Sequence, residues 1–231
     1  MKKAGDEAPA VELIVSGDGS HTLFVPGLNE HYHSVFGAIA ESRHIYINSG
    51  FNYLKDKKGN IRILEIGFGT GLNALVTFLE ALKTKRIVEY TSVEKFPLNE
   101  EVISKLNYTE FIDYPGIKLL YEQIHHSPWD QDVSLGTHFT LHKVHLALED
   151  YIPEYQYFDL IYFDAFGPDV QPDMWTLEVF QKMAAGLKQG GVLVTYSTKG
   201  IVKRNLKEAG FKIEKLPGPA GKREIMRAIS L

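Results

Sequence analysis

The feature that most constrains the fold is the stretch of residues 61–82, IRILEIGFGTGLNALVTFLEAL. Its first six residues are mostly apolar and β-branched, which predicts a short buried strand. Gly67, Gly69 and Gly71 follow at every second position, and a helical pattern then begins. Glycine permits a tight turn and a close approach of a ligand to the backbone, and a helix N-terminus presents free N–H groups. The stretch therefore predicts a strand–turn–helix unit that binds a nucleotide.

The spacing of the glycines distinguishes between kinds of nucleotide site. A dinucleotide-binding fingerprint, G-x-G-x-x-G, would require glycine at Leu72. Here the third glycine comes one residue earlier, in a pattern E-x-G-x-G-x-G that begins at Glu65. This pattern resembles the first motif of S-adenosylmethionine-dependent methyltransferases, whose loop passes the methionine part of the cofactor. A nicotinamide-dependent dehydrogenase is therefore the weakest alternative.

An acidic residue stands where such a fold would bind a ribose. The next predicted strand, residues 87–93, is followed by Glu94. In α/β nucleotide-binding folds, an acidic side chain at the end of the second strand binds the ribose hydroxyls. An ordinary glycine-rich turn with a surface glutamate would also fit these letters, but the two features in register favour a cofactor site. We expect S-adenosylmethionine as the cofactor.

Composition sets the broad class of the protein. The chain has 231 residues, of which 44% are hydrophobic and 23% charged, as in one large globular domain or a domain with a small extension. It has no cysteine, which excludes disulfides, cysteine nucleophiles and thiolate metal sites. No stretch approaches the roughly 20 apolar residues of a membrane span, and the N-terminal MKKAGDEAPA lacks the apolar centre of a secretory signal. We expect a cytoplasmic enzyme without a membrane partner.

Charge is distributed unevenly along the chain. From Lys199 to the end there are nine Lys or Arg and three Glu, a local charge of +6. The remainder has 16 basic and 26 acidic residues, a charge of −10. A basic C-terminal face on an acidic body could bind phosphates, although a pair of solvated amphipathic elements would give the same count.

The N-terminal part predicts an extension to the main domain, which we place at residues 1–55, with the main domain at 56–231. Residues 11–24 predict a hairpin around a Gly-Asp-Gly-Ser turn, residues 34–43 have helical spacing, and residues 45–47 look extended. His31 and His33 have no second cluster at ligand spacing, so no metal is expected. Tyr32 and its neighbours are expected to cap the cofactor.

Strands and helices alternate in the main domain. We expect helices over 72–82, 97–106, 146–151, 174–187 and 201–209, strands over 138–142, 157–163 and 192–196, and a C-terminal hairpin around PGPAG. Residues 107–136 are expected to form a helix and loops, with His125 and His126 in solvent. The pattern predicts an α/β, doubly wound, mostly parallel seven-stranded sheet with an antiparallel last strand. Together with the glycine motif, this order resembles the Rossmann-like fold of class I methyltransferases.

A second informative stretch is DAFGPDVQPDMW, residues 164–175. Asp164 follows a strongly apolar strand, and catalytic groups in open α/β sheets gather at that edge. Gly167 and two prolines predict a stiff loop, which Phe166 and Trp175 flank. Such a loop could hold a small amine between an acceptor and apolar walls. A plain βα loop with a tryptophan in the core remains the alternative interpretation.

Together, LEIGFGTGLN, SVEKFPL, LNEHYHSVFGAIAESRHIYI, DAFGPDVQPDMW and GKREIMRA resemble the methyltransferase component of the MnmC/MnmD family, from about residue 15 to the C-terminus. The resemblance implies methyl transfer from S-adenosylmethionine to the amine of 5-aminomethyluridine, or its 2-thio form, at the tRNA wobble position. Some members carry a fused FAD-dependent domain that first exposes this amine. We expect this chain to lack that domain and to perform only the methylation, which leaves the aminomethyl group to a separate enzyme.

The resemblance also implies roles for individual residues. Asp164 would orient the amine or accept its proton, and Phe166 and Trp175 would wall the amine or stack on a flipped uridine. The cofactor would be held by Tyr32, Glu65, Gly67, Gly69, Gly71, Asn73, Glu94, Lys95 and Asp164. The substrate and the tRNA would be held by Pro168, Gln171, Pro172, Lys199, Lys203, Arg204, Lys207, Lys222 and Arg223.

Two positions depart from the family pattern. Gln171 stands where relatives commonly have asparagine, a shorter amide, so the substrate geometry can differ. The third strand of the main domain ends in Lys143-Val-His145, where an aspartate often meets adenine. No adenine contact is therefore assigned there.

Two alternatives from other classes remain open. An aminopropyltransferase resembling spermidine synthase would also use a glycine loop, an acidic ribose partner and a strand-end aspartate. The basic C-terminal part and the Pro-x-Met-Trp string count against it, and activity on a free polyamine would decide for it. The other alternative is a non-catalytic cofactor-binding partner of tRNA, which turnover by the purified chain would dismiss.

Overall fold

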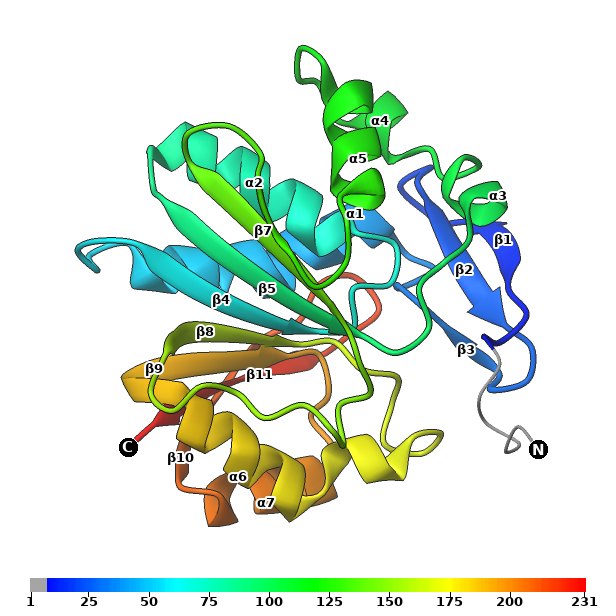
Figure 1. Ribbon diagram of the computed structural model, residues 1–231. Helices are drawn as coiled ribbons and strands as arrows, with labels where there is room; N and C mark the ends of the chain where they lie inside the picture. Colours follow the sequence, from blue (N-terminus) through cyan, green and yellow to red (C-terminus); the bar gives the residue numbers. More distant parts are fainter. Residues whose placement is uncertain (1–7) are drawn as a thin grey trace.

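The computed structural model describes residues 8–231, and Figure 1 shows a large twisted sheet covered by helices on both faces, with a small sheet at one side. The small sheet is antiparallel and has the order β1-β2-β3. It consists of β1 (Glu12–Val15), β2 (His21–Val25) and β3 (Glu30–His31). It lies beside the edge of the large sheet where the parallel strands end.

The large sheet has the order β10-β11-β9-β8-β4-β5-β7-β6. Its parallel pairs are β4 with β5, β4 with β8, β5 with β7, and β8 with β9, while β11 runs antiparallel between β9 and β10. Its strands are β4 (Ile61–Ile66), β5 (Val88–Glu94), β6 (Asp132–Ser134), β7 (Phe139–His145), β8 (Phe158–Phe163), β9 (Leu187–Thr195), β10 (Phe211–Pro217) and β11 (Glu224–Ser230).

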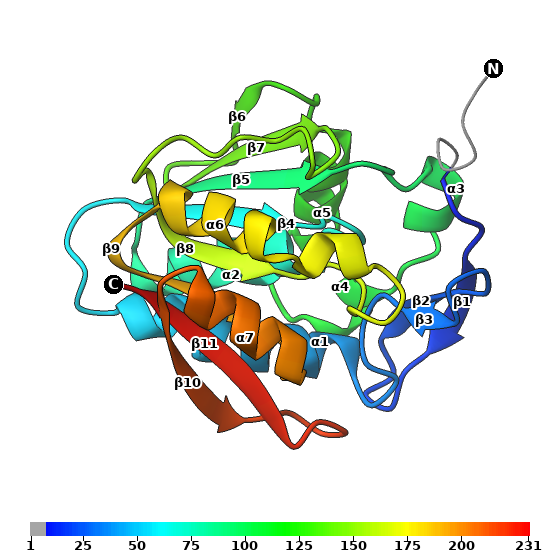
Figure 2. The ribbon, with the colours of Figure 1, turned by 90° about the horizontal axis from the view of Figure 1, so that it is seen from below.

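Helices cover both faces of this sheet. Figure 2 shows α6 (Leu177–Gly186) and α7 (Gly200–Glu208) together on one face. The remaining helices are α1 (Ala38–Ser42), a π-helical turn (Arg43–Asn48), a 3₁₀ turn (Phe51–Leu54), α2 (Leu72–Thr84), α3 (Glu100–Ile103), α4 (Tyr108–Phe111), α5 (Ile117–His126) and a 3₁₀ turn (Pro172–Trp175). None of the helices within residues 8–231 has the length and apolarity that crossing a membrane requires.

The sheet is buried on both faces because successive side chains of a strand point to opposite sides. In β4, Ile63 belongs to the core beneath α2, whereas Leu64 belongs to the core beneath α6 and α7. In β8, Tyr162 and Phe163 divide in the same way. The near-continuous apolar runs in the sequence are therefore central strands of a two-sided core.

The strand order reverses beside β4, and this positions the site. From β4 the chain proceeds outward through β5 to β7, and then returns to the other side of β4 through β8 and β9. Ligands of open α/β sheets bind at such a switch point, outside the carboxyl ends of the strands. Gly67 and Asp164, which directly follow β4 and β8, meet at this place.

The predicted fold class is confirmed: the sheet is mostly parallel and its last strand is antiparallel. Two short strands extend the prediction. β6 adds an eighth, antiparallel edge strand within residues 107–136, and β3 adds a third strand to the N-terminal hairpin. Both are only two or three residues long, too short to give a periodic signal in the sequence.

Three local predictions are wrong. Residues 45–47, expected to be extended, lie in the π-helical turn, where Ile45, Tyr46 and Ile47 are buried against the core and the backbone is satisfied locally. Residues 146–151 form a single turn instead of a helix, ahead of Pro153, which disfavours helix before it. Residues 97–106 contain only the short α3.

The division at residue 55 stays a prediction, and residues 1–7 lie outside the described part of the chain. Residues 38–48 contact α2 and β9 of the main domain directly. The extension therefore shares the core of the domain that follows it.

A matched pair of leucines tests the two-sided core. Leu141 on β7 is fully buried and Leu119 on α5 is 60% exposed. Leu141→Ala should reduce the free energy of unfolding by about 2–5 kcal/mol, because it leaves a cavity in a close-packed interior. Leu119→Ala should change it by less than about 0.5 kcal/mol. Urea denaturation measures both, and equal effects would contradict the described packing.

Candidate active site

A cavity of about 530 Å³ lies at the carboxyl ends of β4, β5 and β8. This volume suits a cofactor together with part of a substrate. Its walls come from the N-terminal segment 28–36, the glycine loop, the end of β5, residues 146–149, the loop after β8, and the turn before β11. The predicted residues that line it are Tyr32, Gly67, Gly69, Asn73, Glu94, Lys95, Asp164, Phe166, Gln171 and Lys222.

The glycine loop has a backbone that other residues adopt poorly. Gly67, Gly69 and Gly71 have φ of +91°, +48° and +69°, all in the region that favours glycine. A Cβ on Gly67 would lie 3.0 Å from the Asp164 carbonyl oxygen, and one on Gly69 would lie 3.0 Å from the Tyr32 ring. The loop therefore needs glycine both for its conformation and for its close neighbours.

Helix α5 holds this loop through the carbonyl of Thr70. The Tyr121 hydroxyl donates to that oxygen at 2.7 Å, and His125 Nε2 lies 3.1 Å from it. Burial lowers the pKa of His125 to about 4, so the ring is neutral and can donate one N–H to the carbonyl. On the other side of the loop, His33 Nε2 lies 2.9 Å from the Thr70 hydroxyl.

The expectation of a solvated His pair is therefore wrong for His125, which is 9% exposed. His126 is exposed, as expected, and lies 2.9 Å from Glu100. The sequence of residues 107–136 has little periodicity, so nothing in it indicated that α5 returns to the cofactor loop. The helical spacing of Tyr121 and His125 was the signal present.

Glu94 connects β5 to the glycine loop. Its Oε2 accepts the Gly69 N–H at 3.1 Å, and its Oε1 accepts the Phe96 N–H at 2.8 Å. The carboxylate is thus oriented at the cavity wall, beside Tyr32. Burial and the negative charge of Glu94 raise the pKa of Tyr32, so its phenol stays protonated.

Asp164 follows β8 and faces the same cavity. Asn73 Nδ2 donates to its Oδ2 at 2.8 Å, and the Ser42 hydroxyl in turn donates to Asn73 Oδ1. Withdrawal from bulk water raises the pKa of Asp164 above its ordinary value, which makes the carboxylate a better proton acceptor. Asn73 therefore orients a carboxylate that lines the cavity.

Glu65, predicted to hold the cofactor, does not line the cavity. It is fully buried within the sheet, where the Ser92 hydroxyl donates to its Oε2 at 2.6 Å. Burial raises the pKa of Glu65 to about 8, so the side chain is largely protonated at neutral pH. Gly71 also lies behind the cavity wall, where it begins α2.

The loop of residues 164–175 divides into a cavity side and a core side. Phe166 faces the cavity and meets the Tyr32 ring edge-on, with centroids 5.0 Å apart. Trp175, predicted to contact the substrate, is 1% exposed and packs on Phe163 and Phe180. Its Nε1–H donates to the Phe166 carbonyl at 2.7 Å, so Trp175 supports the loop from behind.

Besides Gln171, only Lys222 among the remaining predicted substrate residues lines the cavity. Pro168 and Pro172 line a separate small hollow with Ile201. Lys199 pairs with Asp169, and Lys222 pairs with Glu41 inside the cavity. Arg204, Lys207 and Arg223 are exposed and Lys203 is half-buried, all outside the cavity.

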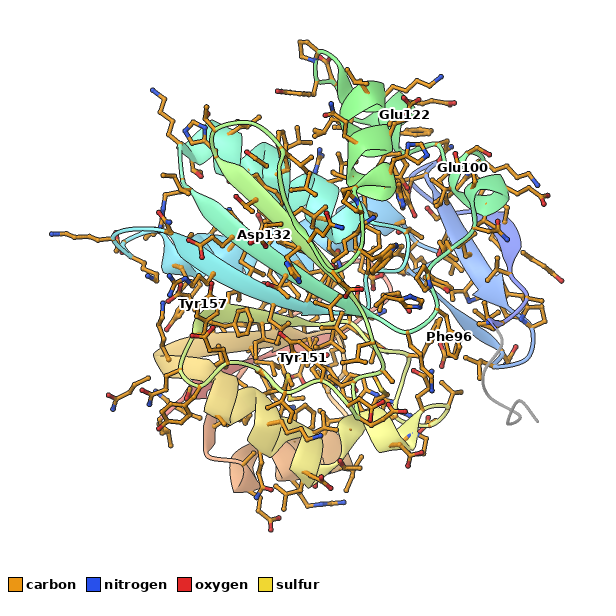
Figure 3. All side chains as sticks on the ribbon, in the orientation of Figure 1. Phe96, Glu100, Glu122, Asp132, Tyr151 and Tyr157 are labelled. Carbon is orange, nitrogen blue, oxygen red and sulfur yellow. The ribbon has the colours of Figure 1, made fainter. Side chains whose placement is uncertain are left out.

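Four apolar side chains form part of the cavity wall. They are Val93, Phe96, Leu146 and Leu148, and Figure 3 shows Phe96 between the large sheet and the small N-terminal sheet. Lys143, from the third-strand end, is buried away from it, with Nζ donating to the His125 carbonyl at 2.6 Å. Residues 8–231 contain no group of His, Asp and Glu arranged to hold a metal ion.

Comparisons with known proteins agree with this geometry. Residues 116–230 match a family described as S-adenosyl-L-methionine-dependent methyltransferase. The bifunctional protein MnmC of tRNA 5-methylaminomethyl-2-thiouridine biosynthesis is 30% identical in Nitrosospira multiformis, covering 89% of this chain and 35% of that protein. The corresponding MnmC of Burkholderia multivorans is 31% identical, with 96% and 35% covered. The chain thus spans about a third of the length of these relatives.

Solved structures show the same architecture. MnmC2 from Aquifex aeolicus superposes with a TM-score of 0.78 and 27% identity, covering 96% of this chain and 70% of that one. Spermidine synthase from Thermotoga maritima superposes with a TM-score of 0.54 at 15% identity, covering 92% and 69%. The second likeness concerns the fold alone.

Two glycines with similar backbones test the cofactor loop. Gly67→Ala should raise the dissociation constant for S-adenosylmethionine at least about tenfold, because left-handed strain and the Asp164 carbonyl together displace the loop. Gly59→Ala is the control: Gly59 has φ of +78°, but a Cβ there meets nothing within 4 Å. Calorimetric titration measures both, and equal losses would show that backbone strain alone accounts for the effect.

Buried Glu65 predicts a pH dependence of stability. Its pKa is about 8 in the folded protein and its ordinary value is 4.5, so the folded state binds the extra proton between these values. The free energy of unfolding therefore decreases as the pH rises through this window. Glu65→Gln stays neutral, so its melting temperature relative to wild type should rise between pH 5 and pH 8. Parallel pH profiles for the two proteins would contradict the shift.

Proposed function

The chain belongs to the S-adenosyl-L-methionine-dependent methyltransferase family that it shares with the MnmC proteins, and on this premise we propose that it methylates the primary amine of 5-aminomethyluridine, or its 2-thio form, at the tRNA wobble position. The observation that carries the proposal is the meeting of the glycine loop, Glu94 and Asp164 in one cavity. A separate enzyme would supply the aminomethyl group, and tRNA modification would place the protein in the cytoplasm.

The cavity fits S-adenosylmethionine at the glycine loop. Gly67 and Gly69 line the cavity and carry no side chain, so the backbone can approach a ligand closely. Glu94 would accept the ribose hydroxyls with the lone pairs that Gly69 and Phe96 leave free. The apolar part of the wall formed by Val93, Phe96 and Leu148 would hold the adenine. The bound cofactor supplies a methyl group on a sulfonium sulfur.

Asp164 would act on the acceptor amine. An alkylamine is largely protonated near pH 7, as lysine is, and its lone pair must be free to accept a methyl group. The carboxylate, oriented by Asn73, can accept an N–H from the ammonium and then its proton. The raised pKa of Asp164 favours that transfer, and the surrounding aromatic rings disfavour the charged amine. Holding the amine in line supplies further rate through proximity.

Tyr32 and Phe166 would hold the acceptor base. Their rings meet edge-on at the cavity wall, one from the N-terminal segment and one from the loop after β8. A base must leave its stack to be modified, and flipped bases are commonly held against aromatic side chains. Gln171 lines the same wall and could donate to a base oxygen.

The exposed basic residues would grip the tRNA backbone. Lys203 and Arg204 lie on α7, and Arg223 lies in the turn before β11. RNA is recognised largely through phosphates, shape and unstacked loop bases. These side chains lie outside the cavity, so they could meet phosphates while the base enters.

Methyl transfer from labelled S-adenosylmethionine to tRNA tests the proposal. Label should appear on tRNA bearing 5-aminomethyluridine and not on fully modified tRNA. Transfer of an aminopropyl group, instead of the labelled methyl group, to a free polyamine without RNA would support an aminopropyltransferase, the alternative suggested by the fold of spermidine synthase. Cofactor binding without any turnover would support a non-catalytic tRNA partner.

Two aspartates, one in β8 and one directly after it, test the catalytic assignment. Asp164→Asn should lower kcat about 100-fold or more while changing the dissociation constant for S-adenosylmethionine less than about threefold, because the amide cannot accept the proton. Asp159→Asn is the control: Asp159 lies near the other end of β8, 3% exposed, and pairs with Lys57 and Lys188. It should lower stability and leave kcat unchanged. Equal loss of turnover and cofactor affinity in Asp164→Asn would assign Asp164 to cofactor binding.

A further inference from the structure

Lys222 lies inside the cavity instead of on the outer basic surface. Its Nζ is 2.7 Å from Glu41 Oε1, and the Glu41 side chain is only 8% exposed. Glu41 Oε2 accepts the Ser34 N–H at 2.6 Å. Both oxygens of a nearly buried carboxylate are therefore engaged, and one of them fixes the lysine.

The ammonium group lies on the Asp164 side of the cavity. Lys222 Nζ is 5.2 Å from the centre of the Tyr196 ring. The Tyr196 hydroxyl donates to the carbonyl of Ala165, the residue after Asp164, at 2.9 Å. Lys222 and Asp164 both line the cavity, so one acceptor bound there can meet both the carboxylate and this cation.

The position of Lys222 is set by two distant segments of the chain. Glu41 belongs to α1 in the N-terminal part, and Lys222 belongs to the turn that joins β10 to β11. Gly221 has φ of +81°, and a Cβ there would collide with the Phe36 ring. The turn thus packs closely on the N-terminal segment, and the lysine is held from both sides.

We propose that Lys222 donates a hydrogen bond to O4 of the acceptor uracil and so determines its base specificity. A lysine ammonium has three N–H donors, and its ion pair with Glu41 Oε1 leaves donors for a further acceptor. In a uracil substituted at C5, the neighbouring C4 carries the carbonyl oxygen O4. When the aminomethyl group lies at Asp164, O4 therefore lies on the same side of the base as that group, toward Lys222. Cytosine presents an amino donor at that position and would repel the cation. The inference rests on the proposed function.

A phosphate contact fits Lys222 less well. Its side chain is only 28% exposed and its charge is already paired with Glu41. Arg204 and Arg223, in contrast, are exposed and lie outside the cavity. A base contact and a phosphate contact also differ in their dependence on salt, since each phosphate contact adds about one to the salt slope.

The test compares methyl transfer to two RNA stem-loops, one with 5-aminomethyluridine and one with 5-aminomethylcytidine. Wild type should prefer the uridine stem-loop at least about tenfold in kcat/KM, the effect of one unsatisfied polar group. Lys222→Met should lose about that factor on the uridine stem-loop and bring the two substrates within about threefold. Its affinity for S-adenosylmethionine and its salt slope should be those of wild type.

Control variants separate the explanations. Lys207→Met removes an exposed lysine of α7 and should leave the uridine preference intact. If Lys222→Met fails to fold because Glu41 is left unpaired, the double variant Lys222→Met with Glu41→Gln removes both charges and should show the same loss of preference.

A preserved uridine preference in an active Lys222→Met variant would overturn the inference and leave the proposed function intact. So would a salt slope reduced by about one, which would make Lys222 a phosphate contact. A wild-type chain that binds S-adenosylmethionine and methylates neither stem-loop nor aminomethylated tRNA would overturn the proposed function, and this inference with it.

Discussion

The structure depends on a glycine loop whose backbone is held from several directions. Its three glycines take left-handed conformations, and its polar groups are bound by side chains from elsewhere: the Gly69 N–H by Glu94 of β5, and the Thr70 carbonyl by Tyr121 and His125 of α5. Glycine adopts these conformations without steric strain but loses more conformational freedom on folding than any other residue, so the loop depends on its surroundings to hold it. The elements around the cavity therefore fix the cofactor loop, as well as forming its walls.

The side of the cavity that we propose for the acceptor is built differently from the side of the glycine loop. It has a carboxylate of raised pKa, Asp164, oriented by an amide, and two aromatic rings that meet edge-on. It is closed by the N-terminal segment and by the turn before β11, which meet in the ion pair of Glu41 and Lys222. Residues near the two ends of the chain thus complete a site whose centre is the switch point of the sheet.

Two acidic residues at the central strands have different roles because they occupy different positions in the fold. Glu65 and Asp164 both have raised pKa values because burial disfavours their charge. Glu65 lies within the sheet and accepts a hydrogen bond from Ser92, whereas Asp164 lies just past the end of its strand and faces the cavity. The spacing in the sequence predicted that both acids lie beside the cofactor. Spacing gives the distance of a residue along its strand, but it does not show which side chains face the open edge of the sheet.

The sequence by itself determined the alternation of strands and helices, the register of the glycine turn, and Glu94 and Asp164 at strand ends, because these follow from local periodicity and backbone sterics. Only the tertiary structure decided that residues 45–47 are helical and that Trp175 lies behind the loop of residues 164–175. It also decided that α5 holds Thr70 and that the Lys222 side chain points inward to Glu41. Each of these features depends on contacts between residues far apart in the chain. Such contacts form because they bury side chains in the folded protein, and no local sequence pattern specifies them.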